Sequence, residues 1–436
     1  MKMKSEIRGA KSETNPKSGG GISAGPERVR PRTQPYSNFN RLAIFQSPSA
    51  WLRGCARSRA RSAAVRISSF GFLSDFGLRI SAFILPTLLL ALPVARAQTK
   101  SATPCMNVLY KFTTPDVPAL APSEAEVKMR KPYTNAPPAD LPGRGLAQHP
   151  MLYLGEGYNK MFVVAGGKVI WTYQTGGGNE YDDVWMLSNG NILFSRMQYL
   201  AEITPDKKVV WRYDAPTNTE IHCCQPIGMD KVIFIENGLP PVLKIVNIKT
   251  GETEVQHDLP FLQPPDRKNV HPEFRRVRYT AQGTYLCPFL NMHQVIEYDK
   301  NFNAIWTFTT NDVPPDLKFS PWAAIRLKSG NTLISDESGN ATLEVNPQKQ
   351  IVWLLKNSDL PEAYQMKSAP QSCTRLANGN TILCSRGGGG KPQLVEVTPD
   401  KKVVWVLEDY GQLGPATAVQ ILDDPGVPEN PGESEH

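Results

Sequence analysis

The sequence predicts an all-β fold, a six-bladed β-propeller in which strands from the two ends of the domain complete one blade. The first observation behind this prediction is a repeated decapeptide: "EITPDKKVVW" at 202–211 returns as "EVTPDKKVVW" at 396–405. Related segments occupy 246–255, 297–306 and 344–353. Each is expected to form a β-hairpin, because Pro, Asp, Asn and Gly supply turn dihedrals while β-branched residues and Trp suit a pleated sheet.

A second hairpin precedes most of these repeats. Asn-Gly or Ser-Gly between alternating apolar residues is a strong short hairpin signal. It occurs in "MLSNGNILFS" (186–195), "RLKSGNTLIS" (326–335) and "RLANGNTILC" (375–384), and in looser form in "RYTAQGTYLC" (278–287). Two hairpins give each unit four antiparallel strands.

The spacing of the units is the third observation. Successive unit ends are 40, 44, 51, 47 and 52 residues apart, at Trp171, Trp211, Val255, Trp306, Trp353 and Trp405. Four-stranded units of this length are typical of propeller blades. We expect the closing tryptophans to pack between neighbouring blades.

The two ends of the repeat region complement each other. Segment 151–174 lacks the first strand of a unit, and 414–424 resembles a first strand with nothing after it. Together they would complete a sixth blade and leave no exposed edge strand. The propeller is therefore predicted at 149–424, with 98–148 as an extended Pro-rich lead-in and 425–436 as a disordered tail.

The formal charge of +7 is concentrated before the repeats. Residues 1–97 hold 16 Lys and Arg against 4 Asp and Glu, a surplus of 12, and the remaining chain carries a net charge of −5. We interpret 1–79 as a disordered basic leader. The given start lies too early in this interpretation, and translation would begin near Val65 or Leu73. A basic nucleic-acid-binding arm is the alternative, and no nucleic-acid partner is predicted for the propeller.

Segment 80–97 is predicted to be a signal peptide. Arg79 precedes an apolar run, and Ala95-Arg96-Ala97 fits a small-x-small cleavage site. The run is shorter than the roughly 20 residues that a comfortable membrane span needs. We expect a secreted or periplasmic protein that does not span a membrane after cleavage, with an uncleaved anchor as the alternative.

The innermost strand of each blade lines the central channel, so its first residues should form a ring at one mouth. Aligning the hairpins on their turn glycines predicts an outer layer of Asp182, His222, Arg275, Trp322 and Gln371, with Thr417 in the closing blade. The next layer is Asp183, Cys223, Arg276, Ala323 and Ser372.

A ring that contains a histidine, acids and two arginines is typical of a convergent binding pocket. Arg275 and Arg276 would be the fork donors to an anion, His222 the base or nucleophile, and Trp322 the aromatic contact with a ligand. The opposing interpretation is that these groups only hydrate the channel or pair with one another. Whether the ligand is a small molecule, a glycan or a protein stays open.

The cysteines predict one disulfide. With Asn378-Gly379 as a two-residue turn, Cys373 and Cys384 would face each other across a hairpin, at a distance that a disulfide can span in an oxidising compartment. C-x-x-C spacings are absent, so no metal site is predicted.

Two stretches carry a family resemblance. "VNIKTGETEV" (246–255) is similar to the repeat of quinoprotein-like propellers, and 330–353 resembles the secreted arylsulfotransferase-like propellers, which have six blades. The second resemblance implies sulfate transfer between phenols through a channel histidine, in this chain His222. The first implies a quinone cofactor such as PQQ. Some members of that family hold the quinone beside a vicinal disulfide, for which Cys223 and Cys224 would be the counterpart in this chain. Since the calcium ligands of those enzymes cannot be placed, two buried thiols are preferred and no cofactor is predicted.

The function expected from the sequence is ligand binding at the channel mouth, without chemistry of its own. An arylsulfotransferase-like enzyme that uses His222 is the main alternative, and a protein-interaction scaffold that uses the rim is the third.

Overall fold

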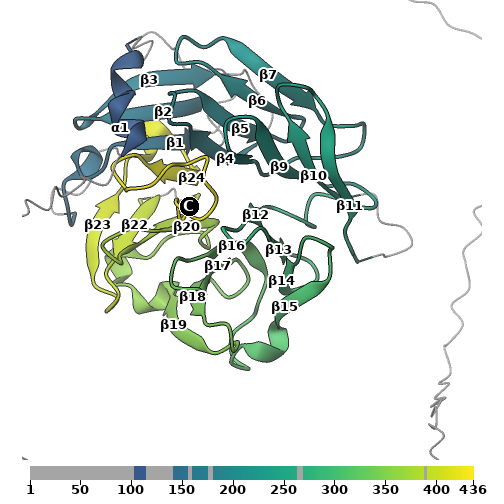
Figure 1. Cartoon of the computed structure of the whole chain (residues 1–436). Helices are drawn as coiled ribbons and strands as arrows, with labels where there is room; N and C mark the ends of the chain where they lie inside the picture. Colours follow the sequence, from purple (N-terminus) through teal and green to yellow (C-terminus); the bar gives the residue numbers. More distant parts are fainter. Residues whose placement is uncertain (1–102, 114–140, 156–159, 175–179, 263–268, 387–389) are drawn as a thin grey trace, which may run out of the picture. The chain divides into compact units, whose positions relative to one another are not determined.

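The computed structural model describes residues 103–113, 141–155, 160–174, 180–262, 269–386 and 390–436. They include the 24 strands of six four-stranded antiparallel sheets, which surround a central channel (Figure 1). The predicted six-bladed β-propeller is confirmed. The expected basic leader and signal peptide lie outside the described residues.

Each blade consists of four strands, named in order from the innermost to the outermost. The first three blades are β24 (Ala416–Ile421), β1 (Met151–Gly155), β2 (Lys160–Ala165), β3 (Lys168–Gln174); β4 (Tyr181–Met186), β5 (Ile192–Arg196), β6 (Tyr199–Ile203), β7 (Val209–Asp214); and β8 (Gln225–Ile227), β9 (Lys231–Glu236), β10 (Val242–Asn247), β11 (Thr253–Asp258). The others are β12 (Arg278–Tyr279), β13 (Tyr285–Phe289), β14 (Gln294–Tyr298), β15 (Ala304–Thr309); β16 (Pro321–Arg326), β17 (Thr332–Asp336), β18 (Ala341–Val345), β19 (Ile351–Lys356); and β20 (Ser372–Arg375), β21 (Thr381–Cys384), β22 (Leu394–Val397), β23 (Val403–Leu407).

Short helical turns connect some of the strands. They are α1 (Pro104–Asn107), α3 (Tyr410–Leu413) and the 3₁₀ turns η1 (Leu109–Lys111), η2 (Gly145–Ala147), η3 (Thr310–Asp312), η4 (Asn357–Asp359) and η5 (Glu362–Tyr364). None of the described helices is long and apolar enough to cross a membrane.

The first blade is closed by the predicted exchange of strands. Strand β24 pairs antiparallel with β1, and Met151 lies opposite Ile421. The innermost strand of this blade thus comes from the C-terminal side of the domain and the other three from its N-terminal side. Closure thus completes the fourth strand of the first blade and pairs β1 on both of its edges.

The repeated decapeptide is explained by contacts between blades. The indole Nε1 of a closing tryptophan donates to the carbonyl of the turn proline in the next blade. The distance is 2.8 Å from Trp171 to Pro205 and 2.9 Å from Trp353 to Pro399. Trp306 makes the same bond to Pro347. The expected packing of the closing tryptophans between blades is thereby confirmed for these positions.

The glutamate of the decapeptide also joins neighbouring blades. Glu344 of β18 accepts from Arg375 of β20 at 2.7 Å, and Glu297 of β14 pairs with Arg326 of β16. A carboxylate–guanidinium pair that is mostly shielded from water is stronger than an exposed pair. The sequence repeat therefore encodes the blade interface as well as the hairpin.

Part of the lead-in departs from the extended structure that was expected. Residues 104–111 form α1 and η1, and the ring of Phe112 packs edge-on against Trp171 with centroids 5.5 Å apart. The Cys105 thiol donates to the carbonyl of Met186 at 3.4 Å. Apolar residues at Cys105, Val108 and Phe112 cover the first two blades, which favours compact turns there. Segment 114–140 lies outside the described residues.

His149 fastens the closing blade to its neighbour. Its Nε2 lies 3.0 Å from Glu396 Oε2 and its Nδ1 3.5 Å from Asp423 Oδ1. Burial lowers the pKa of His149, but the two carboxylates outweigh this and raise it to about 9. Because the folded pKa exceeds the unfolded value near 6.5, the stabilisation is fully present below pH 6.5 and is lost as pH rises through 9.

We expect the loss of stability caused by His149→Gln to depend on pH. Near pH 6 the free energy of unfolding of the variant should be about 2 kcal/mol below that of the wild type, after allowance for solvent screening. This difference should fade by pH 10. Urea unfolding of both proteins across this range measures it. A difference that is the same at pH 6 and pH 10 would show that the imidazolium does not stabilise the closure.

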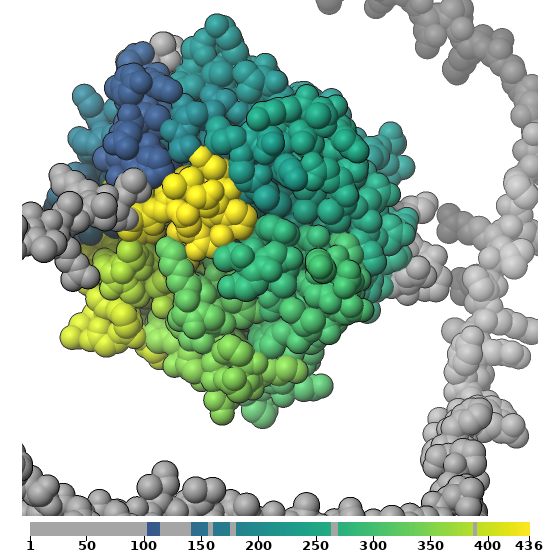
Figure 2. Space-filling model, in the orientation of Figure 1, coloured from purple at the N-terminus to yellow at the C-terminus, as the bar shows by residue number. Residues whose placement is uncertain are grey.

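Segment 425–436, predicted to be a disordered tail, is folded, and this prediction is wrong. It occupies the centre of one face of the propeller, where Figure 2 shows it in yellow among the blades. The segment contacts every blade through hydrogen bonds. Its contacts are with Val419 of the first blade, Val184 and Ser188 of the second, Gly228 of the third, Arg278 of the fourth, Lys328 of the fifth and Arg375 of the sixth.

Candidate functional site

The starts of the inner strands meet at the mouth of the channel that lies opposite segment 425–436. Two of these strands carry β-bulges: the register of β4 shifts between Tyr181 and Val184, and that of β16 between Pro321 and Ala323. A bulge re-aims side chains and is common beside binding sites. Asp182, Asp183 and Trp322 lie within these two bulges.

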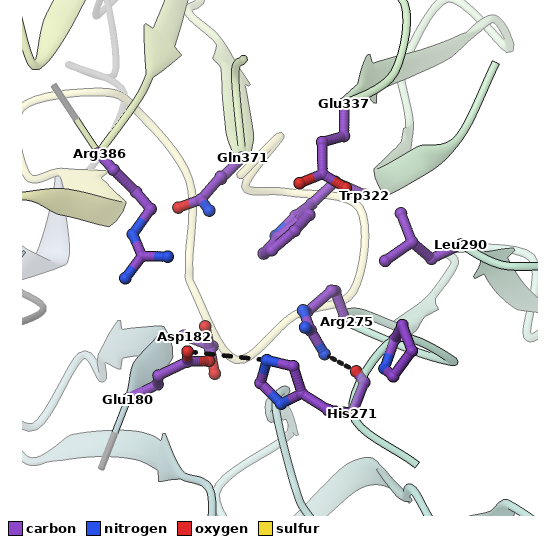
Figure 3. A pocket seen from close by; sticks show the side chains of 10 residues that line it. Glu180, Asp182, His271, Arg275, Leu290, Trp322, Glu337, Gln371 and Arg386 are labelled. Atoms are coloured by element: carbon purple, nitrogen blue, oxygen red, sulfur yellow. Dashed lines mark hydrogen bonds and ion pairs between the residues drawn. The ribbon is translucent and has the colours of Figure 1, made fainter. Parts of the chain in front are cut away.

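A cavity of about 270 Å³ opens at this mouth (Figure 3). Its size suits a small molecule rather than a large one. The lining is polar and contains both signs of charge. It consists of Glu180, Asp182, His271, Pro272, Arg275, Leu290, Trp322, Glu337, Gln371 and Arg386.

Arg275 is held rigidly at the cavity wall. Its Nη1 donates to the carbonyl of His271 and, at 3.3 Å, to that of Phe274, and its guanidinium lies 4.7 Å from the Trp322 ring centroid. A cation over an indole face is attracted by the ring quadrupole. Within the described part of the chain, the buried Nε of Arg275 has no hydrogen-bond partner. Arg275 is thus fixed at the wall by its Nη1 bonds and by the Trp322 ring, with its guanidinium group beside the cavity.

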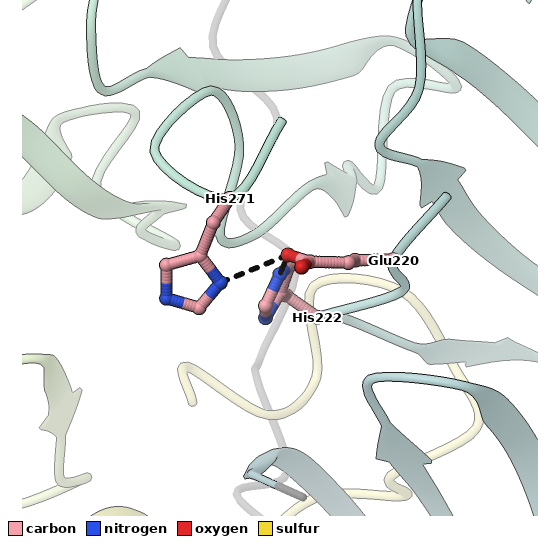
Figure 4. Close-up of side chains that lie close together, drawn as sticks. All are labelled: Glu220, His222 and His271. Atoms are coloured by element: carbon pink, nitrogen blue, oxygen red, sulfur yellow. Dashed lines mark hydrogen bonds and ion pairs between the residues drawn. The ribbon is translucent and has the colours of Figure 1, made fainter. Parts of the chain in front are cut away.

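A chain of acids and histidines lies beside Arg275. His222 Nδ1 lies 2.7 Å from Asp182 Oδ2, and His222 Nε2 lies 2.8 Å from Glu220 Oε2. The same Glu220 oxygen lies 2.8 Å from His271 Nδ1 (Figure 4). His271 Nε2 is 3.7 Å from Glu180. The chain runs from the buried channel to the cavity surface.

These contacts shift the pKa values in the chain. Burial raises the pKa of Glu220, but its bonds with His222 and His271 outweigh this and lower it to about 2. Burial and Arg275 lower the pKa of His222, whereas Asp182 and Glu220 raise it, with a net increase. Glu220 therefore stays ionised, and His222 is clamped between two carboxylates.

Four of the seven predicted site residues line the cavity, namely Asp182, Arg275, Trp322 and Gln371. His222 does not line it: the residue is 2% exposed, and both ring nitrogens face carboxylates. Arg276 also turns inward, and its Nη2 donates to the carbonyl of Asp182 at 2.8 Å. Asp183 is buried beneath the mouth, where it binds Arg278.

The alignment of the hairpins did not identify several residues that lie at or beside the cavity. Glu180, Glu220, His271, Glu337 and Arg386 all lie in connections outside the strands. The strand repeat therefore does not place them. A local signal existed only for His271, which lies four residues before Arg275 on the approach to the same blade.

The predicted disulfide is wrong. Cys373 lies opposite Leu383, and Ser372 lies opposite Cys384. The loop between these strands has three residues, because Leu376 pairs with Asn380 and Gly379 takes a positive φ of 89° as its last residue. This one-residue shift sends the two thiols to opposite faces of the sheet, into different apolar clusters.

Cys223 and Cys224 are two buried thiols, as preferred. They belong to different clusters on the two sides of the third blade. Burial raises the pKa of Cys223 to about 12. Neither thiol is among the residues that line the cavity.

No protein-family description matches the sequence, and no curated protein is similar to it. Among solved structures, the chain is similar to a protein of unknown function from Bacteroides caccae, with 25% identity and a TM-score of 0.54 over 62% of this chain and 97% of that one. Virginiamycin B lyase from Staphylococcus aureus matches with 14% identity and a TM-score of 0.38 over 51% of this chain and 68% of that one. A streptogramin B lyase matches with 11% identity and a TM-score of 0.43 over 64% and 85%. The first match supports the β-propeller fold, and the lyase matches are too distant to bear on the chemistry of this chain.

Proposed function

We propose that the chain is a ligand-binding propeller that holds a small polar molecule with an anionic group at the channel mouth, without chemistry of its own. The supporting observation is that two guanidiniums, those of Arg275 and Arg386, line the same small cavity. Arginine binds carboxylate, sulfate or phosphate groups by charge-assisted hydrogen bonds. Arg275 is already fixed against Trp322, so that little side-chain entropy would be lost on binding.

The acidic groups of the cavity define the rest of the ligand. Glu180 and Glu337 line the same space as the two arginines. Burial raises the pKa of Glu337, while Arg275 and Arg386 act in the opposite direction. A ligand that also carries hydroxyl or amino donors would satisfy these carboxylates. We therefore favour a small polar compound, such as a sugar acid or an amino-acid-like molecule, over a purely anionic one.

The arylsulfotransferase-like alternative is less well supported. A histidine nucleophile must present a ring nitrogen to the substrate. His222 is not among the residues that line the cavity, and its two nitrogens face Asp182 and Glu220. The histidine that does line the cavity is His271. Quinone binding has no support from Cys223 and Cys224, and we propose no cofactor of that class.

Binding is tested by calorimetry with sulfate, phosphate, galacturonate, glutamate and 4-nitrophenyl sulfate. We expect at least one to bind saturably to the wild type, and Arg275→Gln to weaken that binding by about 10- to 100-fold, as the loss of a charged hydrogen bond implies. Arg212→Gln, which removes an exposed arginine paired with Asp214, is the matched control.

The aryl sulfate separates binding from transfer. Release of 4-nitrophenol that His222→Ala abolishes would replace our proposal with the transferase. Binding of none of the five compounds, together with capture of a protein partner through the rim, would instead favour the scaffold. We also propose export after cleavage at Ala97. N-terminal sequencing of the protein from the extracellular or periplasmic fraction should then begin at Gln98.

A further inference from the structure

Three side chains beside the cavity, of which one lines it, have the chemistry of metal ligands. They are Glu220, His222 and His271, and one donor atom from each lies within 4.8 Å of the other two. We propose that they bind a divalent transition-metal ion of the zinc class, with one coordination position open toward the cavity. Two imidazoles and one carboxylate are a ligand set that suits Zn²⁺, Fe²⁺, Co²⁺ or Ni²⁺ better than Mg²⁺ or Ca²⁺, which prefer oxygen.

The donor atoms already have the spacing of a coordination shell. Glu220 Oε2 lies 2.8 Å from His222 Nε2 and 2.8 Å from His271 Nδ1. Ligands about 2.1 Å from an ion are about 3.0 Å apart at right angles and about 3.4 Å apart in a tetrahedron. The third distance, between the two histidine nitrogens, is within 4.8 Å. Small side-chain movements would therefore admit the ion between the three groups, which point toward one another in Figure 4.

The outer nitrogens of both imidazoles face carboxylates. Asp182 lies 2.7 Å from His222 Nδ1, and Glu180 lies 3.7 Å from His271 Nε2. Histidines that bind metals almost always donate their other ring N–H to such a group, which fixes the tautomer and directs the free lone pair at the ion. His222 has such a hydrogen-bonded carboxylate in Asp182, and for His271 the carboxylate of Glu180 is at ion-pair distance.

The charge of the surroundings also favours a cation. Glu180, Asp182 and Glu220 contribute three carboxylates around the donor atoms. Arg275 acts on His222, and Arg275 and Arg276 both act on Asp182. With neutral imidazoles the three carboxylates outnumber the two guanidiniums, so that the group keeps a net negative charge that favours a cation. Uncompensated charges in a largely buried site are costly, so a cation would be stabilised there.

The site is open to the cavity on the side of His271. Its side chain is 33% exposed and lines the cavity, whereas His222 forms the buried end of the cluster. Three protein ligands leave a fourth position for water or for an anionic group of a ligand, as in open zinc sites. The inference rests on the proposed function only in this last respect, because metal binding itself needs no ligand.

The test is a titration of the full chain, free of any histidine tag and stripped with EDTA, with Co²⁺ followed by its visible absorption and with Zn²⁺ followed by calorimetry. We expect one ion per chain with a dissociation constant in the micromolar range or tighter. His271→Ala and Glu220→Gln should each weaken binding by at least about 10-fold, and Asp182→Asn by about 10- to 100-fold through the orientation of His222.

His257→Ala is the matched control, because His257 lies on the outer strand β11, stacked on Phe302 and remote from the cavity. It should leave the affinity unchanged. His271 is partly exposed, so that His271→Ala is expected to fold, which circular dichroism can verify. Binding weaker than micromolar, or binding that His271→Ala and Glu220→Gln do not weaken, would overturn the proposal.

Failure of the metal-site proposal can be distinguished from failure of the proposed anion-binding function. If the anion titrations succeed in EDTA while Co²⁺ does not bind, only the metal site is wrong. If Co²⁺ binds but Arg275→Gln leaves every anion affinity unchanged, only the anion site is wrong.

Discussion

Replacing Asp183 by asparagine is expected to lower the free energy of unfolding by about 3–5 kcal/mol, because it leaves two buried guanidiniums without their counter-ion. Asp183 is fully buried and accepts two hydrogen bonds from Arg278, at 2.7 and 3.0 Å. Arg276 lies 3.7 Å from the same carboxylate. Burial raises the pKa of Asp183, but Arg278 and Arg276 outweigh it and hold the pKa below its usual value, so that the carboxylate is ionised at neutral pH.

The midpoint of urea unfolding at pH 7 measures this effect. Asp214→Asn is the matched control, since it breaks the pair between Arg212 and Asp214, whose side chains are 47% and 66% exposed. An exposed pair is worth about 1 kcal/mol or less, so this variant should unfold close to the wild type. Equal shifts for the two variants would show that the buried charges at the centre of the channel do not hold the blades together.

Deletion of residues 425–436 is expected to destabilise the propeller by about 3 kcal/mol or more, because a hydrogen-bonded network that joins all six blades is lost. The Glu429 carboxylate accepts from Ser188, and the carbonyl of His436 accepts from Arg278 Nε at 3.0 Å. The His436 ring packs edge-on against Trp185, with centroids 4.5 Å apart. These groups are buried, so their removal would expose Trp185 and Arg278 to water.

Thermal unfolding and hydrogen exchange of the inner strands test this expectation. A variant in which 425–436 is replaced by a Gly-Ser segment of equal length should lose as much stability as the deletion, since only the contacts matter. The peptide 425–436, supplied in excess to the truncated protein, should restore part of it by mass action. A truncated protein that melts within about 1 °C of the wild type would contradict the role of the segment.

The fold was predictable because each blade repeats its local signals. The Gly turns, the closing tryptophans and the lone strand at 414–424 each agree with a six-bladed ring. Segment 425–436 was missed because it has no apolar periodicity. Its order comes from carboxylates and a histidine that bind backbone groups of distant blades, such as the Ser188 N–H and the Val184 carbonyl.

The candidate site was predictable only where it follows the repeat. Alignment on turn glycines placed Asp182, Arg275, Trp322 and Gln371 correctly at the mouth, because each lies at or beside the start of an inner strand. The disulfide prediction failed because the loop that ends at Gly379 has one residue more than expected. This shifts the register of one strand against the other by one residue, so that side chains expected on the same face lie on opposite faces.

The loops between the strands do not follow the repeat, so that the positions of their residues could not be predicted by alignment. Glu220 and His271 belong to the loops before the third and fourth blades, and their side chains lie together in Figure 4. Two residues 51 positions apart in the chain thus form one hydrogen bond, a contact that no local pattern encodes.

The central claim is that the cavity at the channel mouth is a binding site for an anionic ligand. It is tested most directly by a crystal structure of the protein with the tightest-binding compound of the calorimetric series. The predicted result is electron density for the anionic group within hydrogen-bonding distance of Arg275 and Arg386, beside Trp322. Density for the compound at another place on the propeller, with this cavity holding only water, would contradict the claim.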